Sequence, residues 1–482
     1  MSKYTLMPFR FKRINKDEVF VNNEVGEYIF LPNDIFNQLI SLKLSKDTDE
    51  YKNLKSKQII ADREITFNIE MLATKYRTKK NFLNEFTTLH MVVPTLRCNG
   101  NCIYCQASSK ALGDSQYDMD KTTAKKIVHT IFNTPARAIK IEFQGGEPLI
   151  NFEIVKYIIL YTNKLNVLYK KRIEFVICTN LTLITESMIK FFKKYDVVIS
   201  TSLDGPENIH NFNRPLKNEN SYKLFCEKLN LVYKYMDIER VSALMTTTQK
   251  SIGNFERIVD EYIDKGFHSI FFRIINPYGL ARQKLFEIGY SVEDFFSSYK
   301  KGLEHILDLN LKGTFFVEEY TSLLLTRILT PFGIGFVDLQ SPAGAGIECA
   351  IYNYNGDVYL SDEGRMLGEM GDKKFLLGNV HKNTYEEIFN NNFLKTITAN
   401  TYLETLPECC DCAFLPYCGA DPVRNYLEQK DIIGNKINST SCQKNRLILD
   451  YLFKLIKEDN ENIIDIFWSW VTYRTLKEIK LS

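Results

Sequence analysis

Three cysteines in the first quarter of the chain are spaced for metal chemistry. Cys98, Cys102 and Cys105 stand in "RCNGNCIYCQ" with the spacing C-x-x-x-C-x-x-C. They follow the apolar run "LHMVVPTL", which predicts a buried strand, so the cysteines should lie in the loop at its carboxyl end. Three thiolates are one fewer than the four that usually fill a zinc or iron–sulfur site. Either a fourth ligand lies elsewhere in the chain, or the metal keeps an open position.

The elements that must position these cysteines are alternating strands and helices. Between residues 88 and 310, six apolar runs that read as strands alternate with helical stretches, which predicts a parallel sheet, open or curled into a partial barrel. Reactive groups gather at the carboxyl ends of the strands in such folds. The cysteine loop and the strings "QGGEP", "CTN" and "SLDG" all fall at such ends. We therefore expect these motifs to converge on one mouth.

Composition narrows the class of protein. A net charge of +2 over 482 residues gives no reason to expect nucleic acid or an anionic membrane as a partner. The N-terminal residues lack the apolar core of a signal peptide, and no run reaches the ~18 apolar residues that span a bilayer. We therefore expect a cytoplasmic protein, in which thiols stay reduced and clustered cysteines indicate metal rather than disulfides.

The pattern along the chain predicts five parts. Residues 1–85 read as short strands and a helix, and 86–310 as the α/β sheet. Residues 311–345 connect this sheet to residues 346–445, which are rich in turns and hold a second group of cysteines. Residues 446–482 read as helical.

The cysteine spacing, together with "FQGGEP" one predicted strand later, resembles the radical S-adenosylmethionine (SAM) superfamily. In that superfamily three cysteines hold a [4Fe–4S] cluster whose fourth iron binds SAM, which would account for the missing fourth thiolate. The resemblance implies a partial (β/α)6 radical SAM barrel. A zinc knuckle is the alternative reading of the three cysteines.

The resemblance also implies which residues bind SAM. Glu147 would hold the amino group of SAM, while glycines beside it let the backbone approach the ligand. Arg214 is a candidate partner for the SAM carboxylate or a surface arginine before a proline, and Asp204 is read as a turn cap. Tyr104 would pack against adenine or merely against its neighbours. The full set implied for SAM is Tyr104, Gly145, Gly146, Glu147, Asn180, Ser202 and Arg214.

A second group of cysteines lies in "PECCDCAFLPYC" and at Cys442. It resembles part of the SPASM domain, which carries auxiliary iron–sulfur clusters in radical SAM enzymes that act on peptides. The resemblance implies that four thiolates complete a second [4Fe–4S] cluster. A structural zinc site is the alternative, and Cys410 could replace its neighbour as a ligand. The implied ligands are Cys409, Cys412, Cys418 and Cys442.

The chain departs from the full SPASM pattern at two expected cysteines. Ser361 and Pro422 stand at those positions, so we expect the other auxiliary cluster to be absent and Cys349 to be a buried thiol. Asp362 follows the first lost position. In the related sulfatase-maturing enzymes an aspartate there acts as a base on the substrate, so Asp362 is a candidate catalytic residue, or it caps a turn.

Longer strings, among them "NEVGEYIFL", "YNGDVYLSDEGRML" and "CAFLPYCGADP", resemble the radical SAM maturases of His-Xaa-Ser peptide systems, the B component. Residues 1–85 resemble, more weakly, the winged-helix-like elements that bind leader peptides. The resemblance implies an enzyme that reductively cleaves SAM and modifies a ribosomally made precursor peptide. Implied partners are that peptide, an electron donor such as flavodoxin or ferredoxin, and a second maturase. The alternatives are an enzyme acting on a sulfatase or a small molecule, and a non-catalytic iron–sulfur protein that binds peptides or senses redox state.

Overall fold

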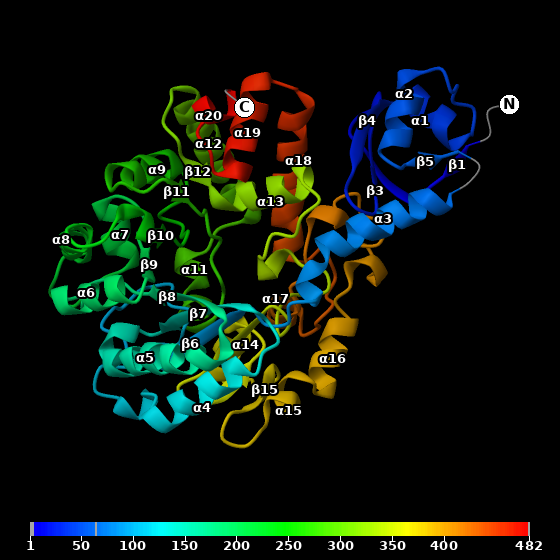
Figure 1. Ribbon diagram of the computed structural model, residues 1–482. Coiled ribbons are helices and arrows are strands. Elements are labelled where there is room, and N and C mark those ends of the chain that lie inside the picture. The colour runs from blue at the N-terminus through cyan, green and yellow to red at the C-terminus, as the bar shows by residue number, and fades with distance from the viewer. Residues whose placement is uncertain (1–3, 63–64, 481–482) are drawn as a thin grey trace. The chain divides into compact units, whose positions relative to one another are not determined.

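The computed structural model describes residues 4–62 and 65–480 (Figure 1). These residues form two compact units, each described by itself. The barrel unit comprises the described residues of Glu85–Tyr320, Ala345–Ile397 and Arg474–Ser482. The N-terminal unit comprises those of Met1–Asn84, Thr321–Gly344 and Thr398–Tyr473. The units combine segments that the sequence placed in separate parts, and the five predicted boundaries remain predictions.

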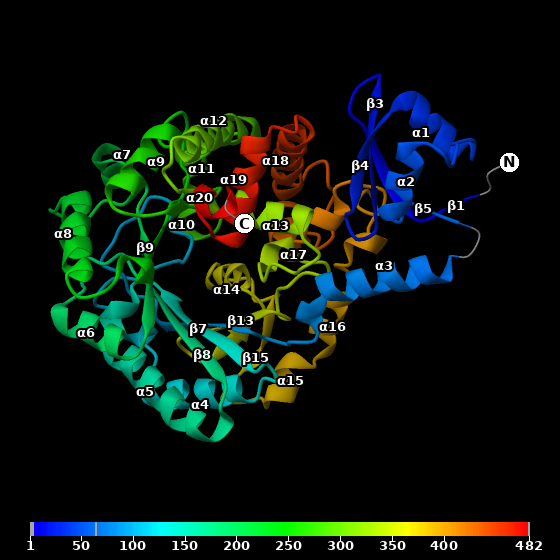
Figure 2. The ribbon, with the colours of Figure 1, turned by 45° about the horizontal axis from the view of Figure 1, so that its top comes forward.

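The described residues of the barrel unit build an eight-stranded sheet in the order β10-β9-β8-β7-β6-β13-β14-β15 (Figure 2). Neighbouring strands from β10 through β6 to β13 pair in parallel, and β14 and β15 are antiparallel. The predicted α/β fold with a parallel strand core is therefore confirmed. The strands are β6 Leu89–Thr95, β7 Ala138–Gly145, β8 Arg172–Cys178, β9 Val197–Ser202, β10 Val241–Leu244, β13 Cys349–Tyr352, β14 Asp357–Tyr359 and β15 Leu376–Asn379.

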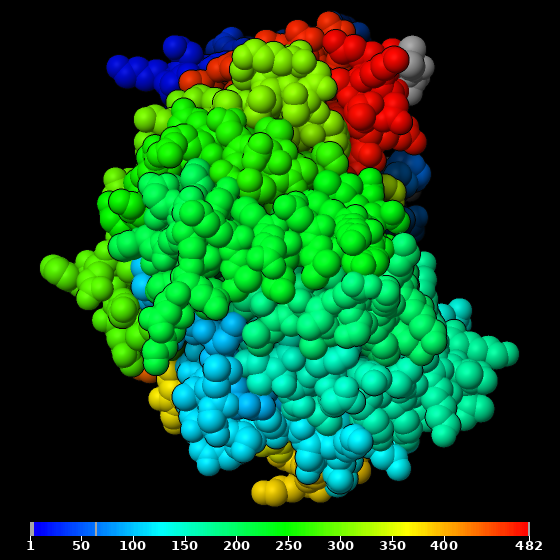
Figure 3. Space-filling model, turned by 90° about the vertical axis from the view of Figure 1, so that its left-hand side faces the viewer, coloured from blue at the N-terminus to red at the C-terminus, as the bar shows by residue number. Residues whose placement is uncertain are grey.

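Helices connect the parallel strands and cover the outer face of this sheet. Side chains of Asp120, Thr185 and Asn220 cap the first turns of α4, α6 and α8, which fixes where these helices begin. The connecting helices are α4 Lys121–Phe132, α5 Phe152–Tyr169, α6 Glu186–Lys194, α7 Glu207–Asn213, α8 Ser221–Tyr233 and α9 Phe255–Asp264. In Figure 3 their residues, cyan to green, lie on the face of the barrel unit that is turned to the viewer.

The sixth predicted strand is much shorter than the run "SIFFRIIN" indicated. Only β11, Ser269–Ile270, forms, and it pairs with β12, Val317–Glu318. The next backbone groups bond elsewhere: the N–H of Phe272 donates to Glu318 Oε1 at 3.1 Å, and that of Ile275 to Tyr290 Oη at 2.8 Å. Because side chains take these donors, the strand ends early.

The rest of the barrel unit is helical and includes parts of two helices that continue into the other unit. Residues 311–345, predicted as a connection with few signals, contain β12 and the whole of α13. The helices are α10 Gly279–Gln283, α11 Leu285–Ile288, α12 Val292–Leu311, α13 Glu319–Leu329, α14 Asp362–Glu369, α15 Tyr385–Phe389, α16 Asn392–Ala399 and α20 Leu476–Lys480.

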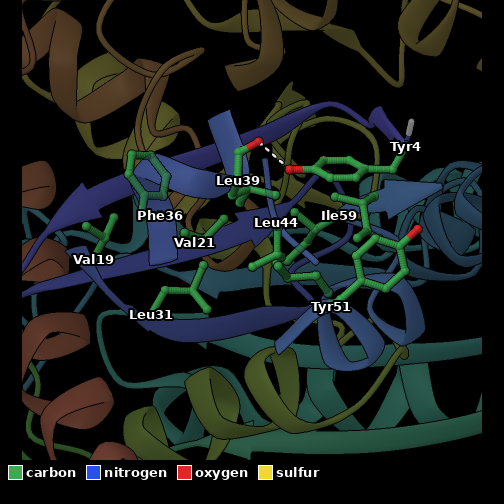
Figure 4. Close-up of a cluster of buried hydrophobic side chains, with 11 residues drawn as sticks. Tyr4, Val19, Val21, Leu31, Phe36, Leu39, Leu44, Tyr51 and Ile59 are labelled. Atoms are coloured by element: carbon green, nitrogen blue, oxygen red, sulfur yellow. Dashed lines mark hydrogen bonds between the residues drawn. The ribbon is translucent and has the colours of Figure 1, made fainter. Parts of the chain in front are cut away.

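The N-terminal unit starts with the strands and helix that the sequence predicted. A buried apolar cluster that includes Val19, Leu31 and Phe36 joins the sheet to α1, and Tyr4 Oη donates to the Leu39 carbonyl at 2.8 Å (Figure 4). The three-stranded antiparallel sheet consists of β2 Phe9–Arg13, β3 Glu18–Asn23 and β4 Tyr28–Pro32. A separate antiparallel pair is formed by β1 Thr5–Leu6 and β5 Ile60–Ala61. The helices are α1 Asn33–Ile40, α2 Asp49–Ser56 and α3 Thr66–Lys79.

The other face of β2-β3-β4 packs within the same unit against the segment that carries the second cysteine group. The ring of Phe20 lies 4.5 Å from that of Phe453 between centroids, and Asn22 Nδ2 donates to the Ala413 carbonyl at 2.7 Å. The helices of that segment are α17 Pro422–Gln429, α18 Thr440–Lys457 and α19 Glu461–Thr472. Among the residues that the structure describes, no helix has the length and apolar character needed to cross a bilayer.

Candidate functional site

The cysteine loop follows β6, as its position after the apolar run predicted. Cys98, Cys102 and Cys105 are each half-buried. Backbone hydrogen bonds hold the loop: Cys98 N–H donates to the Lys110 carbonyl at 3.0 Å and Cys105 N–H to the Cys102 carbonyl at 3.1 Å. These hydrogen bonds give the loop a defined shape, and all three thiols belong to this one loop.

Gly145 and Gly146 join the end of β7 to this loop. Gly145 has φ +135°, and a Cβ added to it would lie 2.2 Å from the Thr95 carbonyl oxygen. A Cβ on Gly146 would lie 2.2 Å from the Arg97 carbonyl oxygen. Since contacts this short are not possible, only glycine fits at either position. The two glycines bring the β7 turn against the chain that leads to Cys98.

Glu147 is buried at the same edge, with 1% of its surface exposed. Its carboxylate accepts from Thr179 Oγ1 at 2.7 Å, Asn180 N–H at 2.8 Å and Leu149 N–H at 3.1 Å. Burial raises the pKa of Glu147 to about 7, and these donors partly oppose that rise. Its charge also helps to raise the pKa of Cys98, after burial. A buried carboxylate close to the cysteine loop is suited to hold a cationic group.

The end of β8 supplies Asn180 to the same edge. The Asn180 Nδ2 donates to Asn99 Oδ1 at 3.1 Å. Both this nitrogen and Cys98 Sγ lie close to Gly100, since a Cβ added to Gly100 would be 3.8 Å from Asn180 Nδ2 and 3.7 Å from Cys98 Sγ. The amide therefore lies beside the cysteine loop. Ser202, the last residue of β9, is half-buried at the neighbouring strand end. Asn99 and Thr179 complete this edge, and sequence reasoning missed both because polar loop residues carry no periodic signal.

Asp204 does not cap a turn, as the sequence suggested, but joins three segments. Its carboxylate is fully buried and accepts from Tyr104 Oη at 2.6 Å, Arg214 Nε at 3.1 Å and Thr246 N–H at 3.1 Å. Arg214 is not a surface residue, since only 15% of its side chain is exposed, and its Nη1 lies 3.9 Å from Cys102 Sγ. Tyr104 packs with Ile275 and other apolar residues. These contacts tie the cysteine loop to the ends of β9 and β10.

Asp362 begins α14, and the residue before it caps the helix. Ser361 Oγ accepts from Gly364 N–H at 3.2 Å, so the capping reading of Asp362 is wrong. Arg365, only 1% exposed, instead donates to Asp362 Oδ1 through Nε at 3.0 Å and Nη2 at 2.9 Å. The pKa of Cys178, at the end of β8, is raised mainly by burial and next by Glu142, and the charge of Asp362 adds a smaller contribution. The carboxylate therefore lies close to the strand ends of the sheet.

In the N-terminal unit, the second cysteine group surrounds a cavity of about 280 Å³. Cys409 lines this cavity and Cys410 does not. Asn445 Nδ2 donates to Cys418 Sγ at 3.4 Å, and Lys436 and Arg446 also line the cavity. Burial raises the pKa of Cys409 to about 12 and that of Cys442 to about 11, while Lys436 opposes both rises. The four cysteines at the cavity are Cys409, Cys412, Cys418 and Cys442.

Cys349 lies in β13 of the barrel unit, 1% exposed, and its Sγ donates to the Leu360 carbonyl at 3.4 Å. The expectation of a buried thiol is confirmed. Pro422, at the other lost cysteine position, occupies the first position of α17 after the capping residue Asp421.

Among the described residues, the thiols of the two cysteine groups are not arranged around a single ion position. Across residues 4–62 and 65–480, no group of three or more His, Cys, Asp or Glu side chains could hold one metal ion. In a four-iron cluster each thiolate binds a different iron, so the thiols need not converge on one point. The 280 Å³ cavity between four thiols offers such a volume.

Comparison with known proteins agrees with this fold. Residues 92–262 match the Radical SAM superfamily. An uncharacterized protein of Methanocaldococcus jannaschii, MJ0907, is 35% identical over 189 residues, which are 39% of this chain and 63% of that protein. The match thus spans less than two thirds of that relative's length.

Relatives with assigned names align over more of the chain. A cysteine-type anaerobic sulfatase-maturating enzyme of Clostridium perfringens is 25% identical over 76% of this chain and 96% of its own. The antilisterial bacteriocin subtilosin biosynthesis protein AlbA of Bacillus subtilis is 23% identical over 77% of this chain and 74% of its own. The solved structure of native anSMEcpe with bound AdoMet and Cp18Cys peptide covers 78% of this chain and 99% of its own, with 20% identity and a TM-score of 0.64.

Proposed function

We propose that this chain, whose residues 92–262 form a radical SAM domain, is an enzyme that reductively cleaves SAM to modify residues of a ribosomally synthesised peptide. The radical SAM superfamily implies a [4Fe–4S] cluster and SAM. When bound, they supply a 5′-deoxyadenosyl radical that abstracts a hydrogen atom from the substrate. The single observation that carries the proposal is the geometry at the strand ends, where the cysteine loop, Glu147 and the Asp204–Arg214 pair meet in one compact unit.

Residues of the barrel unit would hold these cofactors. Cys98, Cys102 and Cys105 are the proposed cluster ligands. The buried carboxylate of Glu147 would accept from the SAM ammonium, and Arg214 has Nη2 left for the SAM carboxylate. Gly145 and Gly146 pack against the Thr95 and Arg97 carbonyl oxygens, and this close packing would hold the turn that carries Glu147 beside the cysteine loop. Tyr104, Asn180 and Ser202 are the proposed neighbours of the SAM nucleoside.

We propose that the second cysteine group holds an auxiliary [4Fe–4S] cluster. The cavity is lined by four thiols, and two cationic side chains, Lys436 and Arg446, lie at it to offset the negative charge of four thiolates. A cluster with all irons ligated by protein suits electron transfer or structural support.

An electron donor such as flavodoxin or ferredoxin, present in the cytoplasm predicted from the sequence, would supply the electron that SAM cleavage needs.

The N-terminal unit offers a binding edge for the peptide. Among the described residues, β2 is an edge strand of its sheet. The N–H of Ile14 donates to the Glu18 carbonyl in β3, and N–H groups of an antiparallel strand alternate in direction. The N–H groups of Phe9, Phe11 and Arg13 therefore face away from β3, on the outer edge. An extended leader peptide could add a strand there. A groove of about 440 Å³ in the same unit, lined by Met7, Ile69, Leu72 and Tyr76 among others, would take apolar side chains of the peptide.

Asp362 is the proposed base of the reaction. Arg365 holds one of its oxygens, which keeps the carboxylate in place and leaves Oδ2 for a substrate proton. A His-Xaa-Ser precursor, matured together with a second maturase, is the substrate that the sequence resemblance favours.

A sulfatase is the second candidate substrate, because the sulfatase-maturating relative aligns over 96% of its length. The test is to incubate dithionite-reduced, cluster-loaded protein with SAM and either a His-Xaa-Ser precursor or a cysteine-containing sulfatase peptide. We expect 5′-deoxyadenosine and a mass change in the precursor. Modification of the sulfatase peptide alone would favour the second candidate. Protein with full iron content but no 5′-deoxyadenosine would indicate a non-catalytic iron–sulfur protein.

A further inference from the structure

A buried charge pair lies next to the cysteine loop. Asp204 has none of its side chain exposed and Arg214 has 15%, and Arg214 Nε donates to Asp204 Oδ2 at 3.1 Å. The same oxygen accepts from Tyr104 Oη at 2.6 Å, and Oδ1 accepts from Thr246 N–H at 3.1 Å. Three donors on one buried carboxylate leave it little freedom to move.

These contacts fix where the positive charge of Arg214 lies. Its Cζ is 5.3 Å from the centroid of the Tyr104 ring, and its Nη1 is 3.9 Å from Cys102 Sγ. Tyr104 stands between Cys102 and Cys105 in the chain, so Asp204 holds both the arginine and the loop that the arginine faces. Charges in such a buried place interact more strongly than charges in water, because little solvent screens them.

We propose that Asp204 is a positioning residue that fixes Arg214 beside Cys102, and that this pair sets the reduction potential of the cluster on the cysteine loop. The proposal rests on the proposed function, which places that cluster on Cys98, Cys102 and Cys105. Reduction adds one negative charge to the cluster. A fixed cation beside a ligand sulfur stabilises the reduced state and raises the potential, while the buried carboxylate opposes this effect.

The two charges predict shifts of opposite sign. Arg214→Met removes the cation and should lower the potential. Asp204→Asn keeps one oxygen that can accept from Tyr104 Oη and Arg214 Nε, while its amide nitrogen faces the Thr246 N–H. It removes the negative charge and should therefore raise the potential. We expect each change to alter the ratio of reduced to oxidised cluster roughly tenfold at fixed applied potential, which is about 59 mV for one electron. The double variant should lie between the two single variants.

The measurement is a redox titration of the reconstituted full-length protein followed by electron paramagnetic resonance. The relevant signal is the one that changes when SAM is added. Asp196→Asn is the matched control, because Asp196 precedes the same strand β9, is 75% exposed and pairs with Arg240. It should leave the potential unchanged. Arg214→Lys keeps the charge and should restore most of the potential lost in Arg214→Met.

Two failures can be told apart. If the wild-type protein takes up iron but shows no signal that responds to SAM, the proposed function fails. If that signal is present and both single variants shift the potential in the same direction, or neither shifts it, the proposed role of Asp204 is overturned and the proposed function stands.

Discussion

Arg365 holds one oxygen of Asp362 and leaves the other available. Its Nε and Nη2 lie 3.0 and 2.9 Å from Asp362 Oδ1, and its Nη1 lies 3.4 Å from the Ala107 carbonyl oxygen in the chain that follows the cysteine loop. Because Arg365 is 1% exposed, the pair is a fixed link between α14 and that chain. Asp362 is thereby positioned rather than mobile.

We predict that Asp362→Asn uncouples SAM cleavage from peptide modification. Asparagine keeps the size of the side chain and an acceptor for Arg365, but it cannot take a proton. General-base catalysis is worth about 100-fold to 10,000-fold, so the yield of modified peptide should fall within that range while 5′-deoxyadenosine still forms. Mass spectrometry of the peptide and chromatography of the nucleoside measure both. Near-normal peptide modification would remove Asp362 from the mechanism.

We predict two clusters in the anaerobically reconstituted protein. It should contain about eight irons, at four per cluster. Replacing Cys98, Cys102 and Cys105 together by alanine should leave about four irons and abolish SAM cleavage. Replacing Cys410 alone should change neither quantity, because Cys409 rather than Cys410 lines the cavity. Loss of about four irons in the Cys410 variant, or about twelve in the wild type, would show that the auxiliary ligands are misassigned.

We predict that the outer edge of β2 binds the leader peptide through its backbone. Phe11→Pro removes an N–H that faces away from β3, together with a ring that is 48% exposed, whereas Phe11→Ala removes the ring alone. A net hydrogen bond of about 1 kcal/mol makes the proline variant bind leader peptide roughly fivefold more weakly than the alanine variant. Fluorescence anisotropy with labelled leader measures this. Equal affinities for the two variants would place the leader elsewhere.

Deleting residues 1–85 is a poorer test of the same proposal. Phe20 and Asn22 pack against Phe453 and Ala413 in the same compact unit, so the deletion would expose an apolar surface beside the second cysteine group. Loss of activity would then report unfolding as well as lost peptide binding.

We predict that His90 makes the apo protein sensitive to acid. Burial lowers the pKa of His90 to about 3, so the unfolded state binds its proton first as the pH falls below about 6.5. The contribution of neutral His90 to the free energy of unfolding is therefore fully present above pH 6.5 and is lost as the pH falls toward the pKa of His90 in the folded state, about 3. Between pH 6 and 5 the free energy of unfolding should fall by about 1 kcal/mol more than in His90→Gln. Urea unfolding at the two pH values measures this, and parallel losses in both proteins would contradict it.

Much of the candidate site could be predicted because its residues lie in short motifs. The spacing of Cys98, Cys102 and Cys105 predicted one loop after a strand, and the structure places that loop after β6. Gly145 and Gly146 were expected to let the backbone approach a ligand, which stays a prediction, and the structure shows them against the Thr95 and Arg97 carbonyl oxygens of the chain itself. The position of the cysteine loop after a strand depends on neighbours in sequence, so a local pattern contains it.

The side-chain partners of the two aspartates could not be predicted in this way. Asp204 was read as a turn cap, and Asp362 as either a catalytic residue or a turn cap, since aspartate often caps turns in loops. The structure gives the cap of α14 to Ser361 and engages both aspartates with arginines. The partners of a buried charge are chosen by which strand ends and loops meet, and periodicity does not record this.

The sequence alone therefore determined the strand–helix alternation, the cysteine spacings and the glycine turn, because apolar periodicity and backbone sterics act over a few residues. Only the tertiary structure decided that β2-β3-β4 shares a core with the second cysteine group, that Cys409 and not Cys410 lines its cavity, and that Asp204 joins Tyr104, Arg214 and Thr246. These relationships arise when buried groups find partners as the chain packs, and partners such as Tyr104 and Asp204 lie far apart along the sequence.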